Sequence, residues 1–378
     1  MALLLKFFCK IGPVKCEYRC IAVRNYPKMS HSTAENNQQC AGILVLNPVE
    51  IVERGSMFST IQAHSPAYLT LQQQTNESKK NSETTTMQKV SWGINNDYMP
   101  LHDVLLGVPE YFQWVEAGPL IGRTLANAEK TGAKFDLQLA MSQHAEMVRI
   151  YEDNGVKCHY LDSDPVLHRN FFARDSSAMT PWGALICHMQ LKVRRADYVT
   201  AIRFYQENNI PIWNYATAGH FEGGDFVILE PGKVLIGYCG ERSEKAGSEQ
   251  VAEFVRKEGW DAMTAPISRE FVHMDGLVVP LAEKLLVACI DALEPWLVQQ
   301  LRDWGFDFVD VPYAEAKNLG VNLVALGNGK VLSMIGATQL NEKMRALGFE
   351  VYAPDMSMFT LGGGGVHCLA QALCRDDA

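Results

Sequence analysis

The sequence predicts an α/β fold in which five units, each made of strands and one helix, form a closed repeat. Five positions typical of helix C-caps are separated by 54, 50, 46 and 43 residues, and a short apolar segment follows each one. These positions are Gly155, Asn209, Gly259, Gly305 and Gly348. Glycine and asparagine tolerate the left-handed backbone that ends a helix. A repeat of roughly 50 residues is typical of such architectures. An α/β sandwich with evenly spaced helices is the alternative.

The N-terminal quarter differs from the rest of the chain. Its first thirty residues carry six basic side chains against one acid, Glu17, and residues 71–89 are polar and poor in aromatic residues. We therefore expect a poorly ordered extension over residues 1–89 and a folded domain over residues 90–378. The apolar, basic start is also compatible with a mitochondrial transit peptide, although it has no clear small-residue cleavage site.

Amphipathic segments precede the cap positions. Leu137, Met141, His144, Val148 and Tyr151 share one face of a helix that would end near residue 155. Leu297, Leu301 and Trp304 do the same before residue 305. A helix with one such face packs it against a core.

Apolar runs of strand length lie between these helices. They cover residues 183–188, 225–229, 233–237, 285–290 and 321–326. Short runs rich in Val, Ile and Leu indicate buried strands. Helices and strands therefore alternate along the domain.

Composition limits the functional classes. With 34 basic and 43 acidic residues the net charge is −9, which disfavours nucleic acid and anionic membranes as partners and favours a cationic small molecule. No apolar segment reaches the roughly 18 residues that span a bilayer. The ten cysteines form no CxxC pair and no zinc-type cluster with histidine, as expected for reduced thiols in a cytoplasmic protein without a metal.

Four polar groups of residues stand at the ends of strand-like runs. They are Phe171–Asp175, Glu222–Asp225, His273–Asp275 and Gly362–Cys368. Taken singly, each also fits a structural role, such as an ion pair, an acidic turn, a surface histidine or a buried thiol. Four consecutive glycines, however, display the following cysteine at a tight backbone feature, which suits a nucleophile.

Together these residues fit nucleophilic catalysis on a planar cation. A thiolate needs a positive charge nearby, and a guanidinium supplies that charge with planar N–H donors that carboxylates bind in pairs. Asp175 and Asp275 would hold the guanidinium, and the glycines would leave room for it to lie flat beside Cys368. His273 would give a proton to the leaving nitrogen and then take one from water, while Glu222 orients its imidazole.

This set of motifs resembles the superfamily of guanidino-group-modifying enzymes: arginine deiminases, dimethylarginine dimethylaminohydrolases and amidinotransferases. The resemblance covers about residues 90–378, which it identifies as a catalytic domain. It implies a five-bladed α/β propeller of ββαβ units (a pentein) and neither a metal nor an organic cofactor. It also implies that Cys368, His273, Asp175 and Asp275 are catalytic or bind the guanidinium.

The resemblance is closest to arginine deiminases at two stretches. One is Glu222–Asp225, which places Asp225 among the substrate-binding residues. The other is residues 237–243, where Arg242 would help to hold a substrate carboxylate. Arg194, or Arg195 next to it, would share this role by its spacing from Asp175. Ser176 and Ala370 depart from residues common in the family, which leaves the substrate's identity open.

The sequence thus predicts a hydrolase that cleaves a C–N bond of arginine or a substituted arginine. Cys368 would form a covalent thiouronium intermediate, and water would release a ureido product such as citrulline with ammonia or an amine. Two alternatives are an amidinotransferase that passes the amidino group to an amine, and a catalytically silent guanidino-binding protein. A homo-oligomer is compatible with the sequence.

Overall fold

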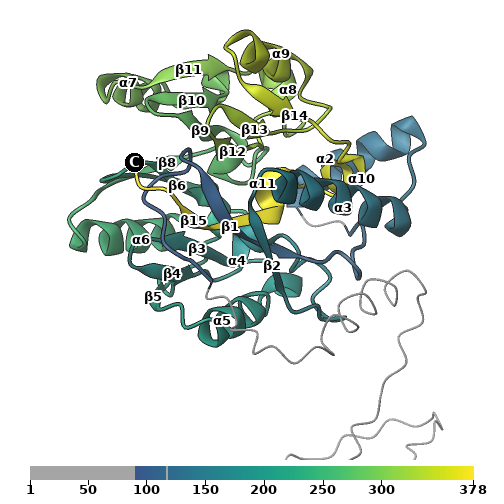
Figure 1. Ribbon diagram of the computed structural model, residues 1–378, viewed down its shortest axis with the longest axis horizontal. Coiled ribbons are helices and arrows are strands. Elements are labelled where there is room, and N and C mark those ends of the chain that lie inside the picture. The colour runs from purple at the N-terminus through teal and green to yellow at the C-terminus, as the bar shows by residue number, and fades with distance from the viewer. Residues whose placement is uncertain (1–89, 116–117) are drawn as a thin grey trace, which may run out of the picture. The chain divides into compact units, whose positions relative to one another are not determined.

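The computed structural model of the protein describes residues 90–115 and 118–378 (Figure 1). The predicted extension over residues 1–89 lies outside the described residues, and its boundary with the folded domain stays a prediction. No helix of the described ranges is long and apolar enough to cross a membrane.

The described chain forms five sheets of three strands each. In every sheet the middle strand pairs with one neighbour antiparallel and with the other parallel. We call the antiparallel neighbour the leading strand. The leading strands are β3 (Ser177–Thr180), β6 (Phe226–Glu230), β9 (Val278–Ala282), β12 (Val324–Gly327) and β15 (Ala370–Arg375). The middle strands are β4 (Gly183–Ile186), β7 (Lys233–Tyr238), β10 (Leu285–Ala288), β13 (Lys330–Leu332) and β1 (Leu101–Gly107). The parallel neighbours are β5 (Ile212–Tyr215), β8 (Asp261–Pro266), β11 (Asp307–Asp310), β14 (Glu350–Tyr352) and β2 (Lys157–Leu161).

A helix joins the middle strand of each sheet to its parallel neighbour, as a parallel crossover requires. These helices are α3 (Leu137–Asp153), α5 (Tyr198–Glu207), α6 (Lys245–Lys257), α7 (Pro295–Asp303) and α9 (Thr338–Ala346), with α2 (Gly118–Thr131) added in the first crossover. All five predicted cap residues follow these helices with positive φ, from +55° at Asn209 to +91° at Gly348. The predicted caps are therefore confirmed.

The sheets follow one another in a closed order. We number the sheets by their middle strands in chain order, so that the sheet of β1 is the first and the sheet of β13 is the fifth. Contacts join β15 to β3, β6 to β9, β9 to β12 and β12 to β1, and the short helices α4 (Ala173–Ser176) and η3 (Gly223–Asp225) join the second sheet to the third. Because β15 pairs with β1, the last strand of the described residues completes the sheet that contains the first one. The predicted five-unit α/β fold is confirmed.

The core lies between the leading and middle strands and the helices that cover them. Every residue of β3 and β4 is buried, whereas β5 and β14 are only partly buried. The predicted helix faces are also turned inward, since Tyr151 of α3 and Leu297 of α7 are fully buried. The parallel neighbour in each sheet is thus partly exposed to solvent, and the leading strands surround the interior of the domain.

Candidate active site

The four predicted motifs all lie directly before leading strands. Helix α4 precedes β3, η3 precedes β6, η4 (Met274–Gly276) precedes β9, and α11 (Val366–Leu369) precedes β15. The sequence placed them at the ends of strand-like runs, whereas the structure places them at the beginnings. Because the leading strands adjoin one another, these starting turns bring residues far apart in the sequence into one region.

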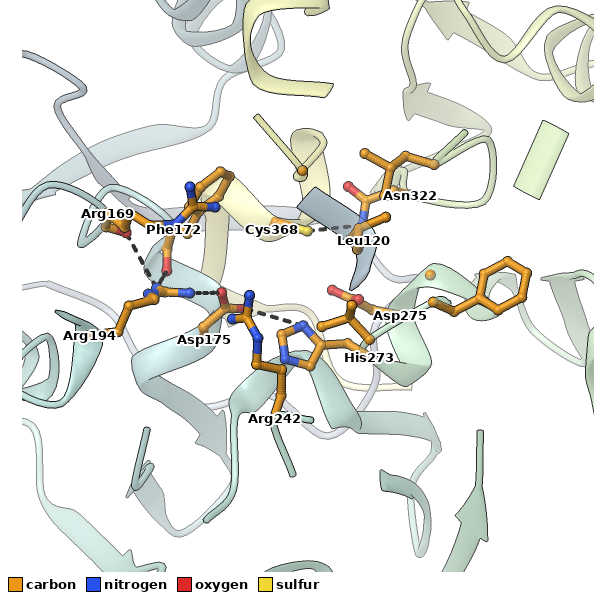
Figure 2. A pocket seen from close by; sticks show the side chains of 15 residues that line it. Leu120, Arg169, Phe172, Asp175, Arg194, Arg242, His273, Asp275, Asn322 and Cys368 are labelled. Carbon is orange, nitrogen blue, oxygen red and sulfur yellow. Dashed lines mark hydrogen bonds and ion pairs between the residues drawn. The ribbon is translucent and has the colours of Figure 1, made fainter. Parts of the chain in front are cut away.

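Six of the eight predicted site residues line one cavity, shown in Figure 2. They are Cys368, His273, Asp175, Asp275, Arg194 and Arg242. Leu120 of α2 also lines the cavity, as do Phe172, Arg169 and Asn322. The remaining two predicted residues, Glu222 and Asp225, are fully buried behind this lining.

His273 lies between two carboxylates. Its Nε2 is 3.0 Å from Oε2 of Glu222, and its Nδ1 is 3.7 Å from Oδ1 of Asp175. Burial lowers the pKa of His273, but the charges of Asp175 and Glu222 outweigh burial and raise the pKa to about 9. The imidazole is therefore protonated at neutral pH and can donate a proton.

Glu222 is held in its charged form. Burial opposes the charge, but Arg242, whose Nη1 lies 3.2 Å from Oε2, and His273 keep the pKa of Glu222 below its usual range. The backbone N–H of Glu222 also donates to Oγ of Ser243 at 3.0 Å. Glu222 thus lies where an orienting partner of His273 is needed, and Arg242 is paired within the protein.

Asp225 does not reach the cavity. Its Oδ1 accepts the backbone N–H of Met274 at 2.8 Å, and burial raises the pKa of Asp225 to about 7. This bond holds the backbone between His273 and Asp275 in place. Asp225 thus positions the backbone of the motif, and its contact with a substrate stays a prediction.

Arg194 is engaged by protein groups. Its Nε donates to Oδ2 of Asp197 at 2.7 Å, its Nη1 forms an ion pair with Asp175, and its Nη2 faces the carbonyl oxygen of Phe172 at 3.4 Å. Burial lowers its pKa, but the two aspartates outweigh burial and raise the pKa above its usual value. Its role toward a substrate carboxylate stays a prediction.

Cys368 lines the cavity with a neutral thiol. Burial raises its pKa well above the usual value, and the charges of Asp275 and Asp175 raise it further. Nδ2 of Asn322 donates to Sγ at 3.2 Å. A cation placed between the aspartates and the sulfur would lower that pKa.

Asp275 has a partner that the sequence did not predict. Its Oδ2 lies 2.8 Å from Nδ1 of His367, the residue before Cys368. Burial raises the pKa of Asp275, but the bond to His367 outweighs burial and lowers it. Asp275 is therefore a carboxylate, and its link to His367 joins the fourth sheet to the nucleophile turn.

Part of the glycine run has a different role from the predicted one. A Cβ atom on Gly364 would lie 2.3 Å from Cε1 of Phe172, and one on Gly365 would lie 2.4 Å from Oδ1 of Asn322. These two glycines therefore let protein side chains pack against the turn. Gly363 lines the cavity, so room for a flat cation beside the run stays a prediction there.

The sequence missed Asn322, His367 and Arg169. Asn322 stands two residues before β12, as Asp175 stands two before β3 and Cys368 two before β15. The repeat was thus a usable signal for Asn322. Arg169 lies six residues before Asp175 in a turn, and no sequence pattern distinguishes it.

One group in the described part of the chain has the donor types of a metal site: Asp175, Glu222 and His273, whose ligand atoms lie within 4.8 Å of one another. A metal binds neutral imidazole. Because the pKa of His273 is raised to about 9, the group is better suited at neutral pH to holding a proton.

Similarity to known proteins agrees with this geometry. A family model described as "N,N dimethylarginine dimethylhydrolase, eukaryotic" matches residues 109–375. The uncharacterized protein YkgA of Bacillus subtilis is 22% identical over 281 residues, which cover 74% of this chain and 94% of that protein. An arginine deiminase of Borreliella afzelii is 25% identical over 268 residues, 59% of this chain and 64% of that protein.

Solved structures show the same fold. A mutant dimethylarginine dimethylaminohydrolase from Pseudomonas aeruginosa, complexed with citrulline, has a TM-score of 0.61 at 20% identity over 72% of this chain and 99% of that one. The N-terminal domain of ArgZ, a cyanobacterial arginine dihydrolase bound to product, has a TM-score of 0.63 at 18% identity over 72% of this chain and 97% of that one. The chain therefore belongs to the eukaryotic N,N dimethylarginine dimethylhydrolase family, a family of guanidino C–N hydrolases within the predicted superfamily.

Proposed function

We propose that this protein hydrolyses a C–N bond of arginine or a substituted arginine through a covalent bond to Cys368. The observation that supports this most directly is one cavity lined by Cys368, His273, Asp175 and Asp275. A thiol, an imidazole and two carboxylates therefore lie around a single space. That combination suits a planar cation that must lose one nitrogen.

Substrate binding activates the thiol. The charges of Asp275 and Asp175 raise the pKa of Cys368 in the empty site, where burial already disfavours a thiolate. A guanidinium between these carboxylates offsets their charge, so the thiol proton leaves to solvent as the cation binds. The donor Nδ2 of Asn322 then stabilises the thiolate.

In the first half of the reaction the sulfur attacks the guanidinium carbon and gives a neutral tetrahedral adduct. His273 donates its proton to the departing nitrogen, which leaves as ammonia or an amine, and a cationic thiouronium remains on Cys368. A donor is available because the charges of Asp175 and Glu222 keep the imidazole protonated at neutral pH, with a pKa of about 9.

In the second half neutral His273 takes a proton from water, and the resulting hydroxide adds to the thiouronium carbon. Collapse of this adduct breaks the C–S bond, releases the thiolate and leaves a ureido product after loss of a proton. Glu222, 3.0 Å from Nε2 of His273, stabilises the imidazolium each time it forms.

Product analysis tests this proposal. The substrates are L-arginine, Nω,Nω-dimethyl-L-arginine, Nα-acetyl-L-arginine and 5-guanidinopentanoate, and the products measured are ammonia, amine and ureido compound. We expect a ureido product from at least one substrate and none from Cys368→Ser. Cys289→Ser is the matched control, because Cys289 is buried outside the cavity lining.

Mass spectrometry of samples quenched during turnover tests the intermediate. We expect wild-type protein to carry an amidino adduct on Cys368 and the Ser variant to carry none. Ornithine that appears only with an added amine acceptor would identify an amidinotransferase instead. No product and no adduct with any of the four compounds would overturn the proposal and favour a binding protein.

A further inference from the structure

Arg169 is the pocket arginine for which the described residues supply no carboxylate. It lies in the turn between β2 and α4, is 4% exposed, and lines the cavity (Figure 2). No acidic side chain in the described ranges forms an ion pair with it, whereas Arg194 and Arg242 are both paired. Arg169 is therefore a buried cation beside the active site with an incomplete set of partners.

The hydrogen bonds of Arg169 show which of its nitrogen atoms have no partner in the protein. Its Nη2 donates to the carbonyl oxygen of Gly362 at 3.1 Å, and its guanidinium carbon lies 4.9 Å from the centre of the Phe172 ring. Its Nε and Nη1 are buried and find no hydrogen-bond partner among the described residues. Buried donors without partners are costly, so an acceptor is expected from outside the protein.

The charges around Arg169 favour an anion. Burial lowers its pKa, and the neighbouring charges of Arg194 and Arg242 add to this. Together they outweigh the charges of Asp175 and Asp197, so that the pKa falls to about 9. The side chain is still a cation at neutral pH. The charges of those two arginines disfavour a second cation next to Arg169 and favour a carboxylate.

The nearby acids are committed to other groups. In the proposed function Asp175 and Asp275 hold the guanidinium, and Glu222 pairs with His273 and Arg242. If a free amino acid binds, its α-ammonium group therefore lies near the unpaired guanidinium of Arg169, and no carboxylate of the protein is left to pair with that ammonium group. An acid without an α-ammonium group avoids this repulsion.

We propose that Arg169 binds the carboxylate of the substrate and selects guanidino acids that lack a free α-ammonium group. This class includes ω-guanidino carboxylates and Nα-acylated arginines. The inference rests on the proposed function, because it assigns the guanidinium end of the substrate to Cys368 and the acid end to Arg169. It names a specificity-determining residue that Arg194 and Arg242 do not replace.

A matched pair of substrates tests the inference, since L-arginine and 5-guanidinopentanoate differ only in the α-amino group. We expect wild-type kcat/KM to be at least about tenfold higher for 5-guanidinopentanoate. In Arg169→Gln we expect kcat/KM for 5-guanidinopentanoate to fall at least about tenfold, because KM rises, and the preference for this acid over L-arginine to shrink. Butylguanidine has neither a carboxylate nor an α-amino group, so its kcat/KM should be the same in the variant and the wild-type protein.

Arg203→Gln is the control variant, because Arg203 is exposed and pairs with Asp162 away from the cavity. It should keep the wild-type preference. The wild-type ratio is itself a test, so the inference stays falsifiable if Arg169→Gln does not fold. Equal or faster turnover of L-arginine by wild-type protein would overturn the inference and leave the proposed function intact.

Calorimetric binding of the same two acids to wild-type protein separates the two failures. Tighter binding of 5-guanidinopentanoate than of L-arginine, with no turnover of any of the four compounds, would support the role of Arg169 and overturn the hydrolytic function. If neither acid is bound, the inference is overturned, and the hydrolytic function is overturned with it only if none of the four compounds is turned over.

Discussion

The side-chain amide of Asn322 donates a hydrogen bond to Sγ of Cys368 across 3.2 Å. Its Oδ1 accepts the backbone N–H of His367 at 2.9 Å. One amide group therefore holds both the nucleophilic atom and the backbone next to it. This contact joins the turn before β15, which carries Cys368, to the turn before β12, which carries Asn322. The position of the nucleophile therefore depends on a neighbouring unit of the repeat.

The first prediction concerns Asn322→Ala. Loss of the amide donor removes a hydrogen bond to the thiolate, so kcat/KM should fall by about 10- to 100-fold. The alkylation rate of Cys368 by iodoacetamide, measured against pH, should show a higher thiol pKa. Asn341→Ala removes another buried amide, one that donates to Met334, and should leave the alkylation profile unchanged. Equal profiles for all three proteins would remove Asn322 from the mechanism.

The repeat was predictable because it rests on local chemistry. Five positions needed a residue that tolerates positive φ, and glycine or asparagine stands at each of them. The choice of strands that close the ring was not predictable in the same way. Pairing of β15 with β1 joins residues more than 260 positions apart, and no local pattern encodes such a contact.

The candidate site was predictable where the residue type carries the chemistry, as for Cys368 and His273. A site residue was not predictable where only its place in the fold, and not its residue type, gives it a role. Asn322 is an ordinary polar residue in the sequence, and only its place before a leading strand brings it to the sulfur. The glycine run was misinterpreted at Gly364, because a close approach has the same sequence signature whether a ligand or Phe172 lies opposite.

A second prediction concerns stability and pH. The carboxylates of Asp175 and Glu222 outweigh burial and raise the pKa of His273 from 6.5 to about 9 in the folded state. The folded state therefore holds this proton more tightly than the unfolded state. The resulting stabilisation is full below about pH 6.5 and is lost as the pH rises through about 9. It amounts to at most about 3 kcal/mol.

Urea unfolding at pH 7 and pH 10 measures this effect. The free energy of unfolding of the wild-type protein should fall between these pH values, and His273→Gln should show a smaller fall. His102→Gln serves as the control, because His102 is exposed and pairs only with Asp376. The same pH dependence in His273→Gln and wild-type protein would contradict the raised pKa of His273.

A third prediction concerns the glycine run. Gly364→Ala places a Cβ atom 2.3 Å from Phe172, so the turn before Cys368 must shift, and we expect the variant to lose about 1–3 kcal/mol of unfolding free energy. Gly336→Ala is the matched control, since nothing lies within 4 Å of its added Cβ. Chemical denaturation compares the two. If Gly364→Ala is as stable as the control, the close approach of Phe172 does not constrain the turn.

The last prediction concerns closure of the fold by β15. This strand is the leading strand of the first sheet and contacts β3 of the second, so its removal exposes an edge of β1 and opens the order of sheets. A chain that ends at Leu369 should therefore lose its cooperative unfolding transition, as followed by circular dichroism in urea. A chain that lacks only Asp377 and Ala378 keeps all of β15 and should unfold like the full chain. A cooperative transition of the shorter chain at the full-length midpoint would show that the other four sheets are stable without closure.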